Sequence, residues 1–140
     1  MKFAPVIYLI GMLLCILSLF MLVPAIVDWF YGSNDWPAFI ASSLVTVFFG
    51  GACYFSARVC ATEHLELRQA FLLTNSAWLS IALFGSLPFL FSEINMSFVD
   101  AIFESTSGIT TTGSTVIVNL EQTSHGILIW RALLQWLGGV

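Results

Sequence analysis

Long hydrophobic runs, which few charges interrupt, occupy most of the chain. Three of them extend from Phe3 to Val27, from Trp36 to Ala57 and from Gln69 to Ser92. Because about 20 apolar residues in a helix cross the roughly 30 Å of hydrocarbon in a bilayer, each run predicts a membrane-spanning helix. A fourth run begins near His125 and is still apolar at Val140. We therefore expect a fourth span that continues in a longer protein.

Residues 93–124 follow a different pattern, because acidic side chains and many hydroxyl groups exclude a conventional lipid-facing span. The first part predicts a short amphipathic helix from Ser97 to Ile109, with Ser97 as N-cap and Asp100 in the first turn, where an acid suits the helix dipole. At roughly 20 Å this helix is too short to cross the membrane. Its mainly apolar stripe consists of Phe98, Ala101, Ile102, Ser105 and Ile109, and another face carries Asp100, Glu104 and Gly108.

The stretch SGITTTGSTVI, residues 107–117, ends this helix and forms neither a good helix nor a span. A short helix followed by extended Thr/Gly-rich backbone predicts a re-entrant loop, which enters the membrane and returns to the same side. Backbone at that depth must be buried in protein or line a water-filled cavity, and carbonyl oxygens there can replace the hydration shell of a cation. The candidate carbonyls belong to Thr111, Thr112, Gly113 and Ser114. The alternative interpretation is a β-hairpin or a Ser/Thr turn in an external loop.

Composition agrees with a membrane protein. Hydrophobic residues make up 59% of the chain and charged residues 9%, against about 25% charged in an ordinary soluble domain. The sequence predicts an all-α integral membrane fold, with an N-terminal helix pair in residues 1–62 and a span, pore loop and truncated second span in residues 63–140. The net charge of −4 includes no basic patch for nucleic acid, so the expected surroundings are membrane lipid.

The few basic residues predict the orientation. Lys2, Arg58 and Arg68 fall on one side of the predicted spans, whereas Asp28 and Asp35 mark the loop on the other side. Cytoplasmic loops are enriched in Lys and Arg, and we therefore expect a cytoplasmic N-terminus.

Arg131 is the one basic residue expected close to membrane depth. One interpretation pairs it with Glu104, Asp100 or Glu121, so that it supports the pore loop. The other lets its guanidinium group reach outward to the lipid headgroups. Glu104 could attract cations to a pore mouth or hold the loop by hydrogen bonds.

A Cys/His pair and three pairs of small residues suggest no further functional site. Cys60 and His64 are four residues apart, but two ligands make a weak metal site, and we interpret them as a loop cysteine and a solvated histidine. Three pairs of small residues permit close helix contact, namely Gly50-Gly51, Gly85-Ser86 and Gly138-Gly139.

FVDAIFESTSGITTTGSTV, followed by WRALLQWLGGV, resembles the Trk/Ktr/HKT superfamily of potassium transporters, most closely the bacterial TrkH/TrkG-type membrane subunits. A looser likeness in ELRQAFLLTNSAWLSIALFGSLPF extends the resemblance over residues 66–140. The first two spans match only in number and hydrophobicity, as the extra pair that such subunits carry before their repeats. Gln69-Ala70 and Ile109 depart from the family's frequent Asp-Gly and aromatic residue, and neither departure touches the filter.

The resemblance implies four covalently linked repeats around one pore, with one filter glycine in each. It makes Gly113 the filter glycine of the first repeat, with Thr111, Thr112 and Ser114 beside it and potassium as the bound and transported ion. It also implies a bacterial inner-membrane location, a homodimer of the complete chain, and a cytosolic nucleotide-binding regulatory subunit that would bind ATP or NAD. No covalently bound cofactor is expected.

The leading hypothesis is therefore potassium uptake and not catalysis. A membrane enzyme would need a hydroxyl nucleophile among residues 110–115 with His125 or Glu104 as base, but no nucleophile-elbow, zinc-helix or phosphate-loop motif accompanies them. A third hypothesis is a non-catalytic assembly or scaffold subunit whose polar loop docks a periplasmic protein.

Overall fold

The computed structural model describes residues 3–60 and 64–140. These residues form helices and contain no β-strand, which confirms the all-α class. The α-helices are α1 (Ala4–Tyr31), α2 (Trp36–Ala57), α3 (Leu67–Gly85), α4 (Leu87–Phe91), α5 (Phe98–Ile109) and α6 (His125–Gly139), and the short 3-10 helices are η1 (Arg58–Cys60) and η2 (Leu120–Gln122). Lys2, the expected domain boundary between residues 62 and 63, and the side chain of Cys60 lie outside the described part of the chain.

Three helical segments are long and apolar enough to cross a membrane: α1, α2 and the combined segment Leu67–Phe91. They correspond to the three long hydrophobic runs of the sequence. The first helix extends past the predicted end at Val27 and includes Asp28, and it stops at Gly32, whose φ of 71° is a conformation that glycine adopts without steric cost.

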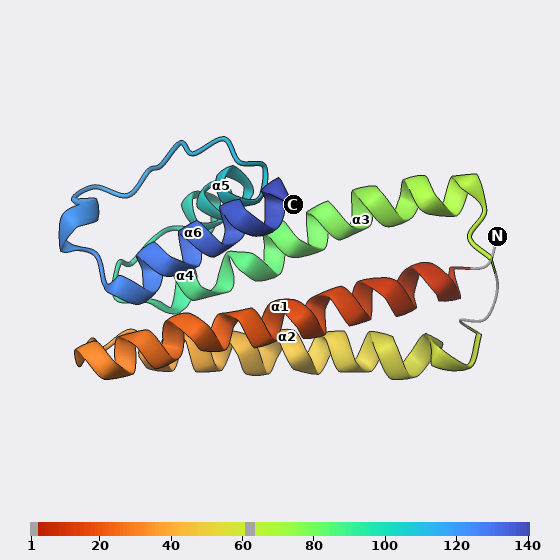
Figure 1. Ribbon diagram of the computed structural model, residues 1–140, viewed down its shortest axis with the longest axis horizontal. Helices are drawn as coiled ribbons and strands as arrows, with labels where there is room; N and C mark the ends of the chain where they lie inside the picture. Colours follow the sequence, from red (N-terminus) through yellow and green to blue (C-terminus); the bar gives the residue numbers. More distant parts are fainter. Residues whose placement is uncertain (1–2, 61–63) are drawn as a thin grey trace.

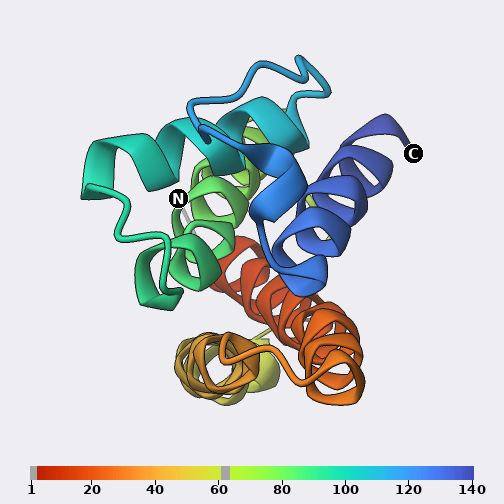
Figure 2. The same ribbon diagram turned by 90° about the vertical axis from the view of Figure 1, so that its left-hand side faces the viewer.

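The helices α1 and α2 form an antiparallel pair along one side of the molecule (Figures 1 and 2). They meet through small residues: a Cβ atom on Gly11 would lie 2.7 Å from the Gly50 carbonyl oxygen, whereas Gly51 has nothing within 4 Å. Ser43 of α2 also donates a hydrogen bond to the Ser18 carbonyl of α1 at 2.9 Å. Without side chains at the crossing the two backbones approach closely, which is a common basis of helix association in membranes.

The third predicted span is interrupted after Gly85, where α3 ends and α4 begins in a new turn. Pro88 near the start of α4 has no N–H group with which to continue the α3 hydrogen bonds. The Gly85 carbonyl at this break accepts a hydrogen bond from Nε1 of Trp130, at 2.9 Å. This interruption therefore joins the third span to α6.

Helices α4, α5 and α6 gather at the end of the molecule where α1 ends, and they leave the first half of α3 uncovered (Figure 1). The view along the helices shows α1 between α2 on one side and the group of α3 and α6 on the other (Figure 2). Helix α5 runs across the long helices, so that it is seen nearly end-on in Figure 1 and from the side in Figure 2, and the segment 110–124 then runs from the end of α5 to the end of the molecule where α6 begins. The entry of this loop into the membrane and its return to the same side stay a prediction.

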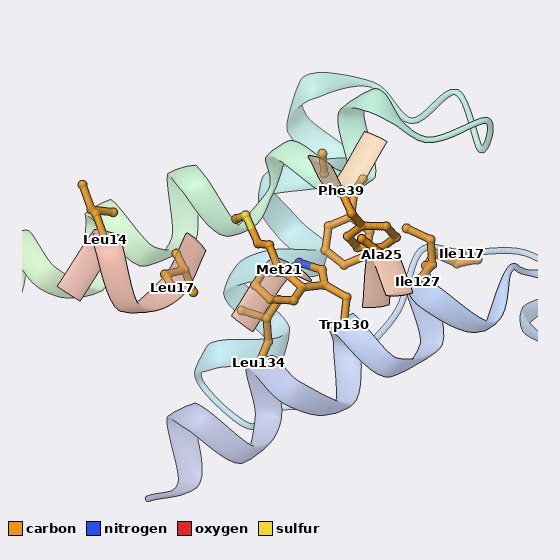
Figure 3. Close-up of a cluster of buried hydrophobic side chains, with 11 residues drawn as sticks. Leu14, Leu17, Met21, Ala25, Phe39, Ile117, Ile127, Trp130 and Leu134 are labelled. Carbon is orange, nitrogen blue, oxygen red and sulfur yellow. The ribbon is translucent and has the colours of Figure 1, made fainter. Parts of the chain in front are cut away.

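A hydrophobic core holds α6 against α1 (Figure 3). Ile127, Trp130 and Leu134, spaced three and four residues apart on one face of α6, are fully buried. They pack with Met21 and Ala25 of α1. Since burying one such side chain contributes about 1.5–3 kcal/mol, this face fixes which side of α6 remains for polar contacts.

Candidate functional site

The helix α5 begins as the sequence predicts. The Ser97 side chain at the N-cap accepts a hydrogen bond from the Asp100 backbone N–H at 3.2 Å, which satisfies one of the donors that a helix start leaves free. Phe98, the first residue of the predicted apolar stripe, is 57% exposed. The stripe residues Ala101, Ser105 and Ile109 are buried, and so is Glu104 on the other face.

The end of α5 changes backbone direction within a few residues. The N–H groups of Thr111 and Thr112 still donate to carbonyls of the last helical turn, at 3.0 Å each. Thr111 then adopts a φ of 60° and Gly113 a φ of 80°. Glycine tolerates this left-handed conformation, but a β-branched threonine is strained in it. Local strain of this kind, about 1–3 kcal/mol, persists only where the surrounding structure enforces it.

The stretch 110–116 contains the carbonyls for which the sequence predicts a filter, and we call it the filter loop after that prediction. It is exposed along its whole length and contains no strand. The hydroxyl groups of Thr110 and Thr112 lie 2.9 Å apart and form a hydrogen bond. The Ser114 carbonyl accepts a hydrogen bond from the Ser107 hydroxyl on α5, at 2.6 Å. Of the four predicted carbonyls, that of Ser114 is thus held against the helix.

Glu104 organises the far end of the filter loop from inside the protein. Its Oε1 accepts a hydrogen bond from the Thr115 hydroxyl, and two backbone N–H groups donate to the same oxygen, those of Val116 at 2.6 Å and Ile117 at 3.3 Å. Charge-assisted hydrogen bonds to a carboxylate are stronger than neutral ones. One buried side chain therefore holds the last two residues of the loop and the residue that follows it.

The second oxygen of Glu104 forms an ion pair with Arg131. Nε of Arg131 donates to Oε2 at 3.0 Å, and the two side chains are 16% and 0% exposed respectively. Among the described residues Arg131 pairs with Glu104 and not with Asp100 or Glu121, both of which are exposed. The Arg131 side chain thus lies against α5, where it is largely buried.

The last turns of α6 pack behind the filter loop. A Cβ atom on Gly138 would lie 1.7 Å from the Ile109 carbonyl oxygen, so the backbones of α5 and α6 touch at this point. One on Gly139 would lie 3.7 Å from Cγ2 of Thr111, and one on Gly113 would lie 3.8 Å from Nε2 of Gln135. The loop therefore rests on α6, with its other side exposed.

Comparison with known proteins identifies the family. A family model described as TrkH, cation transport protein, matches residues 35–140. The chain belongs to the TrkH family.

Among the curated relatives in the TrkH family, the Trk system potassium uptake protein TrkH of Vibrio parahaemolyticus is 40% identical over 100% of this chain and 29% of its own length. TrkH of Escherichia coli K12 is 36% identical over the same shares. The crystal structure of the potassium transporter TrkH from Vibrio parahaemolyticus superposes with a TM-score of 0.94, over 99% of this chain and 30% of that one. The chain thus spans less than a third of these TrkH relatives.

Sequence reasoning placed the filter loop and its supports in one region, but it missed three residues that contact the loop or the end of α5. The sequence indicated Ser107 only as a residue near the end of the helix, whereas its hydroxyl donates a hydrogen bond to the Ser114 carbonyl. Gln135 and Gly138 of α6 approach the loop from a segment more than twenty residues away. The Gly138-Gly139 pair was the one signal that could have indicated this close approach.

Proposed function

We propose that this chain supplies the first of four pore repeats of a potassium uptake protein, with the filter loop as its share of the selectivity filter. The support is its membership of a cation transport family, together with relatives that carry the name potassium uptake protein. The observation that carries the proposal is the exposed filter loop at the end of α5, where two residues have positive φ and a buried carboxylate holds the far end. Such a loop presents main-chain oxygens with little freedom to move.

The proposed mechanism replaces water by carbonyl oxygens. Thr111, Thr112 and Gly113 would contribute main-chain carbonyls to a dehydrated potassium ion, and the C-terminal end of α5 adds its partial negative charge nearby. Three further repeats would complete the ring, because one loop cannot surround an ion. The membrane potential drives the ion inward with about 2.3 kcal/mol per charge per 100 mV.

The assembly is proposed on the same basis. The complete protein would lie in the bacterial inner membrane with its N-terminus in the cytoplasm, form a homodimer, and bind a cytosolic nucleotide-binding regulatory subunit. Arg58 and Arg68 flank the link between α2 and α3, and basic residues in such a link favour its cytoplasmic location. Membership of a transport family supports this role over the enzyme hypothesis.

The test replaces Gly113 by Ser in the complete gene, expressed in cells that lack their own potassium uptake. Serine at a φ of 80° is strained and displaces the carbonyls on either side, and we expect the ratio of K⁺ to Na⁺ uptake to fall roughly tenfold, as 1–2 kcal/mol of strain would produce. Gly51→Ser on α2 is the matched control, because a Cβ atom there meets nothing within 4 Å.

Native K⁺ uptake with an unchanged ratio in Gly113→Ser would keep the transport function and contradict the filter assignment. Native protein that reaches the membrane and takes up no K⁺, even with the regulatory subunit present, would contradict the transport function itself. That second result would favour the scaffold hypothesis, in which the polar loop docks a periplasmic protein.

A further inference from the structure

A buried carboxylate on α1 caps the first turn of α6. Asp28 is 0% exposed, and its Oδ1 accepts a hydrogen bond from the Gly126 backbone N–H at 2.7 Å across 98 residues of sequence. Ser124 stands at the N-cap of α6, yet its side chain makes no capping hydrogen bond. The cap that a helix normally receives from its own N-cap residue therefore comes from another helix.

Gly126 is shaped to receive this carboxylate. A Cβ atom at that position would lie 2.2 Å from Oδ2 and 2.5 Å from Cγ of Asp28. Next to the cap, the Tyr31 ring stacks on the His125 ring with 4.2 Å between centroids and 6° between planes. Two adjacent contacts thus fix the end of α1 against the beginning of α6.

Stability alone does not explain a carboxylate at this contact. Oδ2 of Asp28 is buried with no hydrogen-bond partner among the described residues, and a buried carboxylate oxygen without a partner is costly. A hydrophobic pair at this contact would avoid that cost. We therefore interpret the Asp28–Gly126 hydrogen bond as a positioning contact, because a directional bond fixes how far α6 lies along its own axis relative to α1.

The position of α6 along its axis decides the geometry of the filter loop. Arg131 follows Gly126 by five residues on α6, or roughly 7.5 Å along the axis, and its guanidinium group meets Glu104 at 3.0 Å. Glu104 in turn holds Thr115, Val116 and Ile117. A shift of α6 by a fraction of a turn would separate the Arg131 nitrogen from the Glu104 oxygen.

We propose that Asp28 is a positioning residue for ion selectivity: from the N-terminal helix pair it caps α6 and so fixes the Arg131–Glu104 pair that holds the filter loop. This inference rests on the proposed function. Helix α1, which precedes the proposed pore repeat, then contributes to the geometry of the filter through this one contact.

The first experiment is a thermal-unfolding cycle on the complete protein in detergent, which requires no transport. Gly126→Ala should lower the Tm by several degrees, because the new methyl group meets the Asp28 carboxylate. In an Asp28→Ala background the same Gly126→Ala change should be neutral, because the carboxylate is gone. Equal effects of Gly126→Ala in the two backgrounds would overturn the proposed contact.

The second experiment measures K⁺ and Na⁺ uptake at matched membrane expression. Asp28→Ala should lower the K⁺/Na⁺ ratio by roughly tenfold, the scale set by losing a hydrogen bond to a charged group. Asp28→Asn should restore the native ratio, because its amide oxygen still accepts from Gly126. Ser43→Ala, which removes a buried hydrogen bond within the α1–α2 pair, should leave the ratio unchanged.

The outcomes separate this inference from the proposed function. A native ratio in Asp28→Ala, or the same loss in Asp28→Asn or Ser43→Ala, would overturn the positioning role while K⁺ uptake stands. Absence of K⁺ uptake in the native protein would contradict the transport function and with it this role, and the unfolding cycle would still report on the contact.

Discussion

At the scale of single residues, the buried Glu104 carboxylate binds two different elements, the filter loop and α6. One carboxylate oxygen takes the loop donors and the other takes Arg131. Breaking a buried ion pair by removing one partner costs about 3–5 kcal/mol, since the remaining charge is left without compensation. Substitutions at this position should therefore act on stability and on the loop together.

Glu104→Gln should lower the free energy of unfolding of the complete protein by about 3 kcal/mol. The amide can still accept from the loop through its oxygen, but its NH₂ group then faces the Arg131 guanidinium, and both are donors. Thermal or chemical unfolding in detergent would measure the loss. Glu121→Gln is the control on an exposed acid of the same segment, and a loss of the same size there would contradict a specific role of Glu104.

Two serines on α5 offer a matched pair. Ser107→Ala removes the hydroxyl that donates to the Ser114 carbonyl, so it should cost about 1 kcal/mol and reduce the K⁺/Na⁺ ratio. Ser105→Ala should be neutral or stabilising, because the buried Ser105 hydroxyl has no partner among the described residues. Uptake and unfolding measured on both variants would check this, and a larger loss in Ser105→Ala would contradict the arrangement of α5.

At the scale of elements, α5 and α6 are in direct backbone contact because Gly138 has no side chain. The Ile109 carbonyl, at the end of α5, occupies the place where a Cβ atom of residue 138 would lie. Neither backbone can yield without moving its helix, and the filter loop begins one residue after this contact. The spacing of the two helices is thus transmitted to the loop.

Gly138→Ala should therefore destabilise the protein by about 3 kcal/mol, the upper range for overpacking a tight site. Gly139→Ala is the neighbouring control: its methyl group would make an ordinary contact at 3.7 Å, and alanine favours the helix by about 1 kcal/mol over glycine. Unfolding measurements on the two variants would compare them. Similar stabilities would show that the α5–α6 contact is looser than described.

The sequence predicted elements better than it predicted contacts. Three spans and the start of α5 could be located because hydrophobic length and an N-cap serine are local signals. The break after Gly85 was missed, although Pro88 was the local cause. The Asp28–Gly126 cap joins residues 98 apart, and no periodicity indicates which buried acid will face which helix end.

The roles of the candidate site residues stay predictions. Positive φ at Gly113 suited the expected backbone turn, whereas positive φ at Thr111 contradicts the usual preference of a β-branched residue and could not have been anticipated. The Glu104–Arg131 pair was one of three pairings that the sequence allowed, and the face of α6 left free by Trp130 and Leu134 decides among them.

At the scale of the whole molecule, the course of the chain separates two ends. The link between α1 and α2, the segment that follows the filter loop and the start of α6 share one end, and the end of α2 and the beginning of α3 lie at the other (Figure 1). The basic residues Arg58 and Arg68 flank the second end. Because cytoplasmic loops are enriched in Lys and Arg, we expect this end to face the cytoplasm.

This orientation can be tested by labelling single cysteines in a cysteine-free background of the complete protein. Asn34→Cys, on the exposed α1–α2 link, should react with a membrane-impermeant maleimide in intact cells. His64→Cys, also exposed, should react only after the membrane is permeabilised. The opposite pattern would invert the predicted topology.

The order of residues around Glu104 has a consequence for biosynthesis. Arg131 is 27 residues downstream of Glu104, so at about 5–20 residues per second the ribosome adds it roughly one to five seconds later. During that interval the carboxylate has no cationic partner and is costly to place in hydrocarbon. We therefore expect α5 and the filter loop to wait at the membrane surface and to enter together with α6, as a hairpin, against a preformed α1–α3 platform.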